Sequence, residues 1–267
     1  MDETSRNIAV LIEIENSIKY LRNGLSELQK ITPTNDFYDP LLLFLSSGLE
    51  RLFKTMLCLN FKEVNGRLPL REEIWTYKQG HDIVFLKSKI KKICIPVNRS
   101  FALMDYGLIT NDSLINSICK TLSEFAKRSR YFNMNVILGN EQNFDSKKEW
   151  EKLENKVLID YYGEIEFYKK LGNINLLEDI YKKANELLVS KLEKFFRAIT
   201  RQFIYGDFYS ESKTFVYQIE SFSMIKEEEI GKTDYRILKN DEKIKSIGQV
   251  FNRLLIPVLT ITEAENY

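Results

Sequence analysis

The sequence has few of the residue types from which many enzymes build their sites. His81 is the one histidine in 267 residues, and a single imidazole excludes sites that need two or more histidines. The sequence contains no Gly-rich phosphate loop and no nucleophile elbow. Eleven glycines and five prolines disfavour a loop-rich sandwich and a doubly wound nucleotide-binding fold.

Cysteine and net charge are also scarce. Cys58, Cys94 and Cys119 lie far apart without metal-ligand spacing, which predicts reduced core residues and no metal site. With 39 Lys+Arg against 38 Asp+Glu, no global field attracts nucleic acid or membrane, so any anion site must be local. We expect no cofactor.

Long apolar runs are absent from the sequence. The longest uncharged stretch, Pro40–Leu49, is about half the length that a bilayer requires. The start, MDETSRN, is polar and acidic, unlike a signal peptide. The sequence therefore predicts a cytoplasmic protein with no membrane partner.

Helical periodicity, in contrast, is abundant. Apolar residues recur at steps of three and four, the pattern of amphipathic helices. We expect helices over Thr4–Ile31, Tyr38–Lys62, His81–Ile93, Asp112–Asn135, Lys148–Leu171, Leu176–Tyr205 and Lys243–Leu259, with a short helical piece around Phe101–Tyr106. Ser212–Ser223 is either a strand or a short helix. The predicted fold is all-α, with a bundle over residues 1–138, further helices over 146–267 packed on it, and room for one short strand pair.

Charged residues interrupt two of the expected helices. Glu50 and Arg51 lie inside the most apolar helix, and we interpret them as a buried or half-buried pair that fixes helix register. Acid–base chemistry by Glu50 is the alternative. The lysines from Lys87 to Lys92 are typical of a solvated helix face, with a binding patch as the alternative.

His81 has two interpretations. Gly80-His81-Asp82 can cap a helix, with the imidazole bonded to a backbone carbonyl. Alternatively, His81 is a general base or a phosphate contact, because an unperturbed histidine titrates near neutrality.

The end of the Asp112–Asn135 helix carries a polar cluster. Its members are Lys127, Arg128, Arg130, Tyr131, Asn133 and Asn135. Two guanidiniums beside two amides can bind a phosphate or a partner's carboxylate. Cations at a helix end also complement the helix dipole in water, and the sequence leaves both interpretations open.

Three segments together resemble the HEPN family, the helical "higher eukaryotes and prokaryotes nucleotide-binding" domains. They are Leu49–Leu57 (LERLFKTML), Gly80-His81-Asp82-Ile83 with Leu86, and Ala126–Tyr131 (AKRSRY). The resemblance covers roughly Tyr38–Asn135. It implies a HEPN-like bundle that binds RNA or a nucleotide phosphate, as a homodimer, in a phage-defence or toxin–antitoxin setting.

The family's ribonuclease members combine an Arg with a His shortly after it, and two such pairs meet across a dimer to cleave RNA without metal. By this resemblance the Arg is Arg130 or Arg128, but Asn133 and Asn135 follow where the His is expected, and an amide transfers no proton near pH 7. The candidate catalytic residues are Arg130, His81 and Asn135, and the candidate binding residues are Arg128, Arg130, Tyr131 and Asn133. A metal-independent endoribonuclease and a non-catalytic protein–protein scaffold are the alternatives to an RNA- or nucleotide-binding protein.

Overall fold

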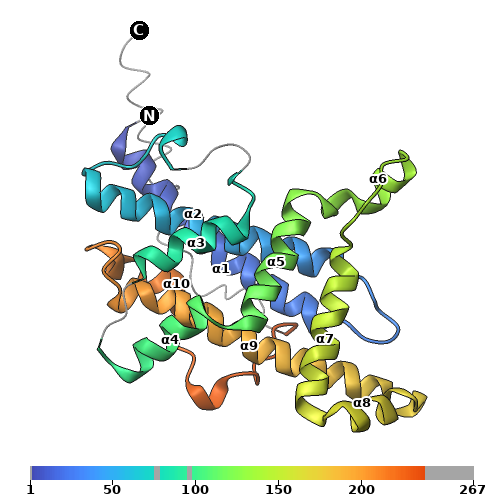
Figure 1. The fold of residues 1–267 in the computed structure, drawn as a ribbon. Coiled ribbons are helices and arrows are strands. Elements are labelled where there is room, and N and C mark those ends of the chain that lie inside the picture. The colour runs from blue at the N-terminus through green and yellow to red at the C-terminus, as the bar shows by residue number, and fades with distance from the viewer. Residues whose placement is uncertain (1, 75–78, 95–97, 238–267) are drawn as a thin grey trace.

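The structure, a computed structural model, describes residues 2–74, 79–94 and 98–237 (Figure 1). These residues form α-helices and short 3-10 turns, and their one strand-type pairing is an isolated bridge between Thr32 and Asn35. The predicted all-α fold class is therefore confirmed. Within the described ranges, no helix is both long and apolar enough to cross a membrane.

The helix bounds follow the predicted periodic segments closely. In chain order the helices are α1 (Glu3–Leu28), α2 (Asp39–Asn65), α3 (Ile83–Ile93), α4 (Ser100–Thr110), α5 (Ser113–Lys127), α6 (Phe132–Ile137), α7 (Ser146–Tyr162), α8 (Glu164–Leu171), α9 (Leu177–Tyr205) and α10 (Val216–Ser223). The predicted helix Lys243–Leu259 lies outside the described residues.

α1 and α2 pack against each other along their lengths and form the centre of the fold (Figure 1). Gly24 and Gly48 lie at the contact: a Cβ on Gly24 would be 2.4 Å from a methyl carbon of Leu45, and one on Gly48 would be 2.7 Å from a methyl carbon of Leu21. Because Gly24 and Gly48 have no side chain, the backbones of the two facing helices can approach closely here. The side chains of Leu45 and Leu21 fill the space that a Cβ would occupy.

One hydrophobic cluster runs through both halves of the chain. It joins Leu21 and Leu45 of the first two helices to Trp150 of α7 and Phe196 of α9, all fully buried. α9 contacts α4, α7 and α10. The division into residues 1–138 and 146–267 stays a prediction.

Two predicted helices end earlier than expected. The helix predicted over Asp112–Asn135 ends at Lys127 and continues as a 3-10 turn, Ser129–Tyr131, and α6. A contact with the loop before α7 holds this turn in place: the buried Ser129 hydroxyl donates to the Phe144 carbonyl at 3.0 Å. The helix predicted over Lys148–Leu171 is split at Gly163, whose φ of +80° favours glycine.

Ser212–Ser223 forms a 3-10 turn and α10, so the strand alternative is wrong. Its buried apolar residues are Phe215, Ile219 and Phe222. Their steps of four and three match one helix face, whereas a strand would bury every second residue. No strand pair forms in the described part of the chain.

Lys87 is an exception to the predicted solvated lysine face. It is 4% exposed, and its Nζ donates to Asn116 Oδ1 of α5 at 2.5 Å. Burial lowers the pKa of Lys87. Lys89 and Lys92 are exposed, as predicted.

All three cysteines are free thiols. Cys94 and Cys119 are buried, as expected, whereas Cys58 is only half-buried. Burial raises the pKa of Cys58 to about 11, so this thiol stays protonated near neutral pH.

Candidate functional site

The site begins at Asp82, which caps α3 and contacts α5. Its Oδ1 accepts the backbone N–H of Phe85 at 2.9 Å and the Ser123 hydroxyl at 3.0 Å, and its Oδ2 accepts Lys127 Nζ at 3.1 Å. Burial raises the pKa of Asp82, but these three donors outweigh it and leave the pKa below its usual value. Asp82 therefore joins the start of α3 to the end of α5, and we call this place the α3–α5 junction.

His81, the residue before Asp82, points to α2. Its Nδ1 lies 3.1 Å from Glu50 Oε2, and Glu50 Oε1 accepts Lys54 Nζ at 2.6 Å. The His81 side chain is 54% exposed. Capping at this point is confirmed for Asp82, but the imidazole contacts a carboxylate where we predicted a backbone carbonyl.

Glu50 and Arg51 do not pair with each other, so that interpretation is wrong. Neighbouring residues on a helix point in different directions, and Arg51 instead contacts Glu13 of α1 at 2.8 and 3.0 Å. Both residues are half-buried, and Glu50 is the less exposed of the two, with a side chain 15% exposed against 39% for Arg51.

The end of α5 presents cations to solvent. Arg128 Nε donates to Glu124 at 2.6 Å, and Lys127 lies 2.9 Å from the same carboxylate. Burial raises the pKa of Glu124, but the hydrogen bonds from Lys127 and Arg128 outweigh it and lower the pKa. The carboxylate is therefore ionised near neutral pH and holds both cations.

Arg130 differs from its neighbours. It is exposed, and its guanidinium carbon lies 5.9 Å from the ring centroid of Phe125, a cation–π distance. Among the described residues, no carboxylate lies within ion-pair range of Arg130. Tyr131, the next residue, is 64% exposed. A cation without a described carboxylate partner and an exposed aromatic residue are thus consecutive in this turn.

The two candidate amides lie on α6. Asn133 is exposed, and Asn135 Nδ2 donates weakly to Gln142 Oε1 at 3.4 Å. α6 buries none of its residues and projects from the helical body (Figure 1). Both amides are therefore on a short projecting helix instead of on the core-facing helix that we predicted.

The structure brings some candidate residues together and leaves others apart. Asp82 and Lys127 connect the His81 segment to the base of the Arg128–Tyr131 turn. Within the described ranges, no hydrogen bond or ion pair joins His81 itself to Arg128, Arg130 or Asn135. Asp82 and Lys127 thus link the two segments, but no described hydrogen bond or ion pair joins the candidate catalytic residues to one another.

Sequence reasoning missed the carboxylates that restrain the junction. Glu124 lies four residues before Arg128, and this spacing is a usable signal for a helical ion pair. Glu50 pairs with His81 at a separation of 31 residues. No local pattern predicts that contact, because it depends on how α2 and α3 pack.

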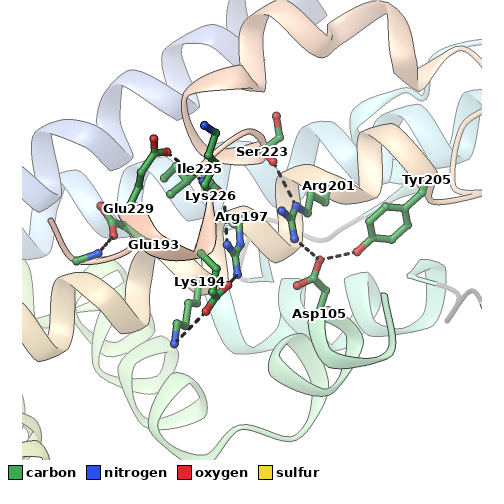
Figure 2. Close-up of polar contacts among 12 residues, drawn as sticks. Asp105, Glu193, Lys194, Arg197, Arg201, Tyr205, Ser223, Ile225, Lys226 and Glu229 are labelled. Carbon is green, nitrogen blue, oxygen red and sulfur yellow. Dashed lines mark hydrogen bonds and ion pairs between the residues drawn. The ribbon is translucent and has the colours of Figure 1, made fainter. Parts of the chain in front are cut away.

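A second polar cluster lies along α9 (Figure 2). Asp105 of α4 accepts the Tyr205 hydroxyl at 2.8 Å and lies 3.6 Å from Arg201. Further along, Arg197 bonds the Ile225 carbonyl at 3.2 Å and Glu227 at 2.5 Å. We call these contacts the α9 network. Each of its charges has an internal partner, so it connects α4, α9 and the segment after α10 without an open binding group.

A groove between α1 and α2 does not coincide with the candidate site. It encloses about 360 Å³ and is lined mainly by apolar atoms, and none of the candidate site residues line it. Groups of histidine, cysteine and carboxylate that could hold a metal ion do not occur in the described part of the chain.

Comparisons with known proteins add no relative. No family model, curated protein or solved structure matches this chain. The chemistry of the α3–α5 junction is therefore the basis for a function.

Proposed function

We propose that this protein binds RNA or a nucleotide phosphate at the turn between α5 and α6, with Arg130 as the main phosphate contact. The observation that carries the proposal is the exposed Arg130, free of any described carboxylate, followed directly in the turn by the exposed Tyr131. A guanidinium binds phosphate through paired N–H donors. An open aromatic ring stacks on a base.

Arg128 and Asn133 supply secondary contacts. Glu124 already holds Arg128, so a phosphate must compete with this carboxylate for the guanidinium. Asn133 is exposed on the projecting α6, where its amide can donate to a phosphate or a base edge. The expected order of importance is therefore Arg130 first, then Arg128 and Asn133.

The resemblance to HEPN proteins extends this proposal. It favours a homodimer in the cytoplasm of a bacterium, in a phage-defence or toxin–antitoxin setting. If the protein is instead a non-catalytic scaffold, the same exposed residues contact a partner protein, and RNA binding is absent.

RNA binding is tested by fluorescence anisotropy with a labelled single-stranded RNA at low and moderate salt. Wild type should bind, and Arg130→Ala should bind at least tenfold more weakly. Lys152→Ala removes another exposed cation, on α7, whose side chain is 70% exposed, and this variant should bind like wild type. Failure of wild type to bind, or equal loss in both variants, contradicts the proposal.

A second candidate function, metal-independent RNA cleavage, is favoured by the contact between Glu50 and His81. A carboxylate on one ring nitrogen fixes the orientation of the imidazole, as in a general acid–base pair. In this mechanism, Arg130 steadies phosphate charge and His81 moves the 2′-hydroxyl proton, while Asn135 in the family's histidine position contributes hydrogen bonds only.

Cleavage is tested with labelled RNA and excess chelator. We expect wild type to leave the RNA intact, because His81 has no direct contact with Arg130. Cleavage that disappears in both His81→Ala and Arg130→Ala, while His81→Ala still binds RNA, would establish the second function instead.

A further inference from the structure

The groove between the first half of α1 and the second half of α2 has the size of a small-molecule site. It encloses about 360 Å³ and is lined mainly by apolar atoms. Ale walls are formed on one side by α1 and on the other by α2 and the segment that follows it, including Leu68 and Pro69. Sites for small molecules in proteins are typically concave, of a few hundred Å³, and mostly apolar with a few polar groups.

The spacing along α1 places its groove residues together. They lie at steps of three, one and three, so they share one face of the helix, and they are Arg6, Ala9, Val10 and Glu13. Ala9 has the smallest side chain of the four and leaves room that a longer side chain would take. The first and last of these residues are seven positions and about 10 Å apart along the helix.

Arg6 is a cation with a neutral partner. Its guanidinium donates to the Pro69 carbonyl at 2.6 Å, and no carboxylate in the described part of the chain lies within ion-pair range of it. Glu73 is instead paired with Arg67 at 2.6 Å. The hydrogen bond from Arg67 lowers the pKa of Glu73 to about 2, and the charge of Arg6 adds to this effect. The other N–H groups of Arg6 can therefore donate to an outside anion.

The acid of the groove, in contrast, is already paired. Glu13 accepts Arg51 Nη1 at 2.8 and 3.0 Å, so this carboxylate and its partner neutralise each other. The Thr55 hydroxyl, also in the groove, donates to the Arg51 carbonyl at 2.9 Å. Arg6 is therefore the groove residue whose charge has no described counter-charge.

We propose that this groove binds a small monocarboxylate with an apolar body, its carboxylate on Arg6 and its body along Ala9, Val10 and Leu68. A guanidinium binds a carboxylate through two parallel N–H bonds, and removal of the apolar body from water adds to the affinity. The distance from Arg6 to Glu13 limits the length of the ligand to about 10 Å. This inference is independent of the RNA-binding proposal, because none of the RNA-site residues line the groove.

Hexanoate is the probe and Cys58 the reporter. Cys58 lines the groove and is half-buried, whereas Cys94 and Cys119 are buried. Alkylation of Cys58 by N-ethylmaleimide, followed by mass spectrometry, should become at least fivefold slower when hexanoate saturates the full-length protein. Hexanol lacks the charge and acetate lacks the apolar body, so each should need at least a tenfold higher concentration for the same protection.

Two variants test the role of Arg6, each compared with its own rate of alkylation without hexanoate. Arg6→Gln removes the charge but keeps a donor for the Pro69 carbonyl, and it should raise the concentration for half protection about tenfold, as expected for a lost charged hydrogen bond. Lys19→Gln removes another cation of α1, which pairs with Glu15 and does not line the groove, and it should behave like wild type.

Three results overturn the inference. They are a lack of hexanoate binding in wild type, equal weakening in both variants, and protection by hexanol at the same concentration as by hexanoate, which would show an apolar groove without a carboxylate site. Ligand-observed NMR titration of hexanoate measures the same affinities if Cys58 reacts too slowly. Arg130→Ala should bind hexanoate like wild type, so the RNA proposal and this inference can fail separately.

Discussion

The α9 network and the α3–α5 junction contain the same types of charged residue but expose them differently. In the α9 network, the Arg197 side chain is 9% exposed and bonds both a carbonyl and a carboxylate. At the junction, the Arg128 side chain is 66% exposed, and Arg130 has no described acidic partner. Burial with internal partners fixes the position of a charge, whereas exposure leaves a guanidinium available to an outside anion.

This contrast separates stability from binding. A buried charge must keep its partners, because losing one leaves an unpaired group in a medium of low dielectric constant. An exposed ion pair contributes little to folding, since water replaces the lost partner. Substitutions in the α9 network should therefore change stability, and substitutions at the junction should change affinity.

The largest effect is expected at Glu193, a fully buried carboxylate of α9 that lies one helical turn before Arg197 and that we count with the α9 network. Glu193→Ala removes the acceptor of the Tyr235 hydroxyl and the Gly231 N–H, and it leaves a cavity. The free energy of unfolding should fall by about 3 kcal/mol, as for a buried polar group whose partners are left unsatisfied. Urea unfolding followed by circular dichroism measures this value.

Glu124→Ala is the matched substitution at the junction. Its partners, Lys127 and Arg128, face solvent, so the free energy of unfolding should fall by about 1 kcal/mol or less. Equal losses in the two variants would remove the distinction between the clusters.

A second large effect is a pH dependence at Glu154. Burial raises the pKa of Glu154 to about 7, although the Tyr38 hydroxyl donates to it at 2.9 Å. The folded state therefore keeps a proton that the unfolded state releases above its ordinary pKa near 4.5, so stability must fall as pH rises from about 4.5 to 7.

We expect the free energy of unfolding of wild type to fall by about 2 kcal/mol between pH 5 and pH 8. Glu154→Gln removes the titrating group and should abolish this fall. Urea unfolding at the two pH values measures it. The control Glu149→Gln changes a half-buried carboxylate on the same helix and should keep the pH dependence of wild type. A fall in stability that persists in Glu154→Gln would place the titrating group elsewhere.

At the junction, the largest effect on affinity should come from removing both guanidiniums. Arg128→Ala with Arg130→Ala should weaken RNA binding at least 30-fold, about 2 kcal/mol, because net charge near zero leaves few other contacts. Lys89→Ala with Lys91→Ala should weaken it only slightly. The affinity of wild type should fall only gently as the salt concentration rises. For single strands, each phosphate contact adds about 0.7 to the slope of log affinity against log salt concentration. A steep slope, or equal loss in both double variants, would indicate diffuse charge.

The smallest expected effect is a gain in affinity for RNA. Glu124→Gln releases Arg128 from its carboxylate and should strengthen RNA binding about threefold, or less than 1 kcal/mol. Glu149→Gln removes a carboxylate that pairs with Lys152 away from the junction and should leave the affinity unchanged. Weaker binding in Glu124→Gln would mean that the carboxylate positions Arg128 for the ligand.

Most of the helical framework could be predicted from the sequence, because burial on one face imposes a repeat of three and four residues. The break in the helix after Lys127 could not be predicted from the sequence, since Ser129 fits the same repeat and no glycine or proline marks the turn. It depends on the hydrogen bond to Phe144, a contact across a loop.

The candidate site was predicted in part. The sequence locates Arg128, Arg130 and Tyr131 at the end of a helix, and the structure shows them exposed there. The contacts that distinguish them depend on packing between distant segments, as for Asp82 with Lys127 and Glu50 with His81. Burial of Lys87 on Asn116 is hidden from the sequence for the same reason.

The most direct test of the account is to identify which residues contact bound RNA. A single-stranded RNA that contains 4-thiouridine is cross-linked to the full-length protein with ultraviolet light, and the modified peptides are identified by mass spectrometry. The account predicts cross-links in residues 129–135, at Tyr131 above all, which disappear in Arg130→Ala. Cross-links confined to residues 87–92, or spread evenly over the surface lysines, would contradict it.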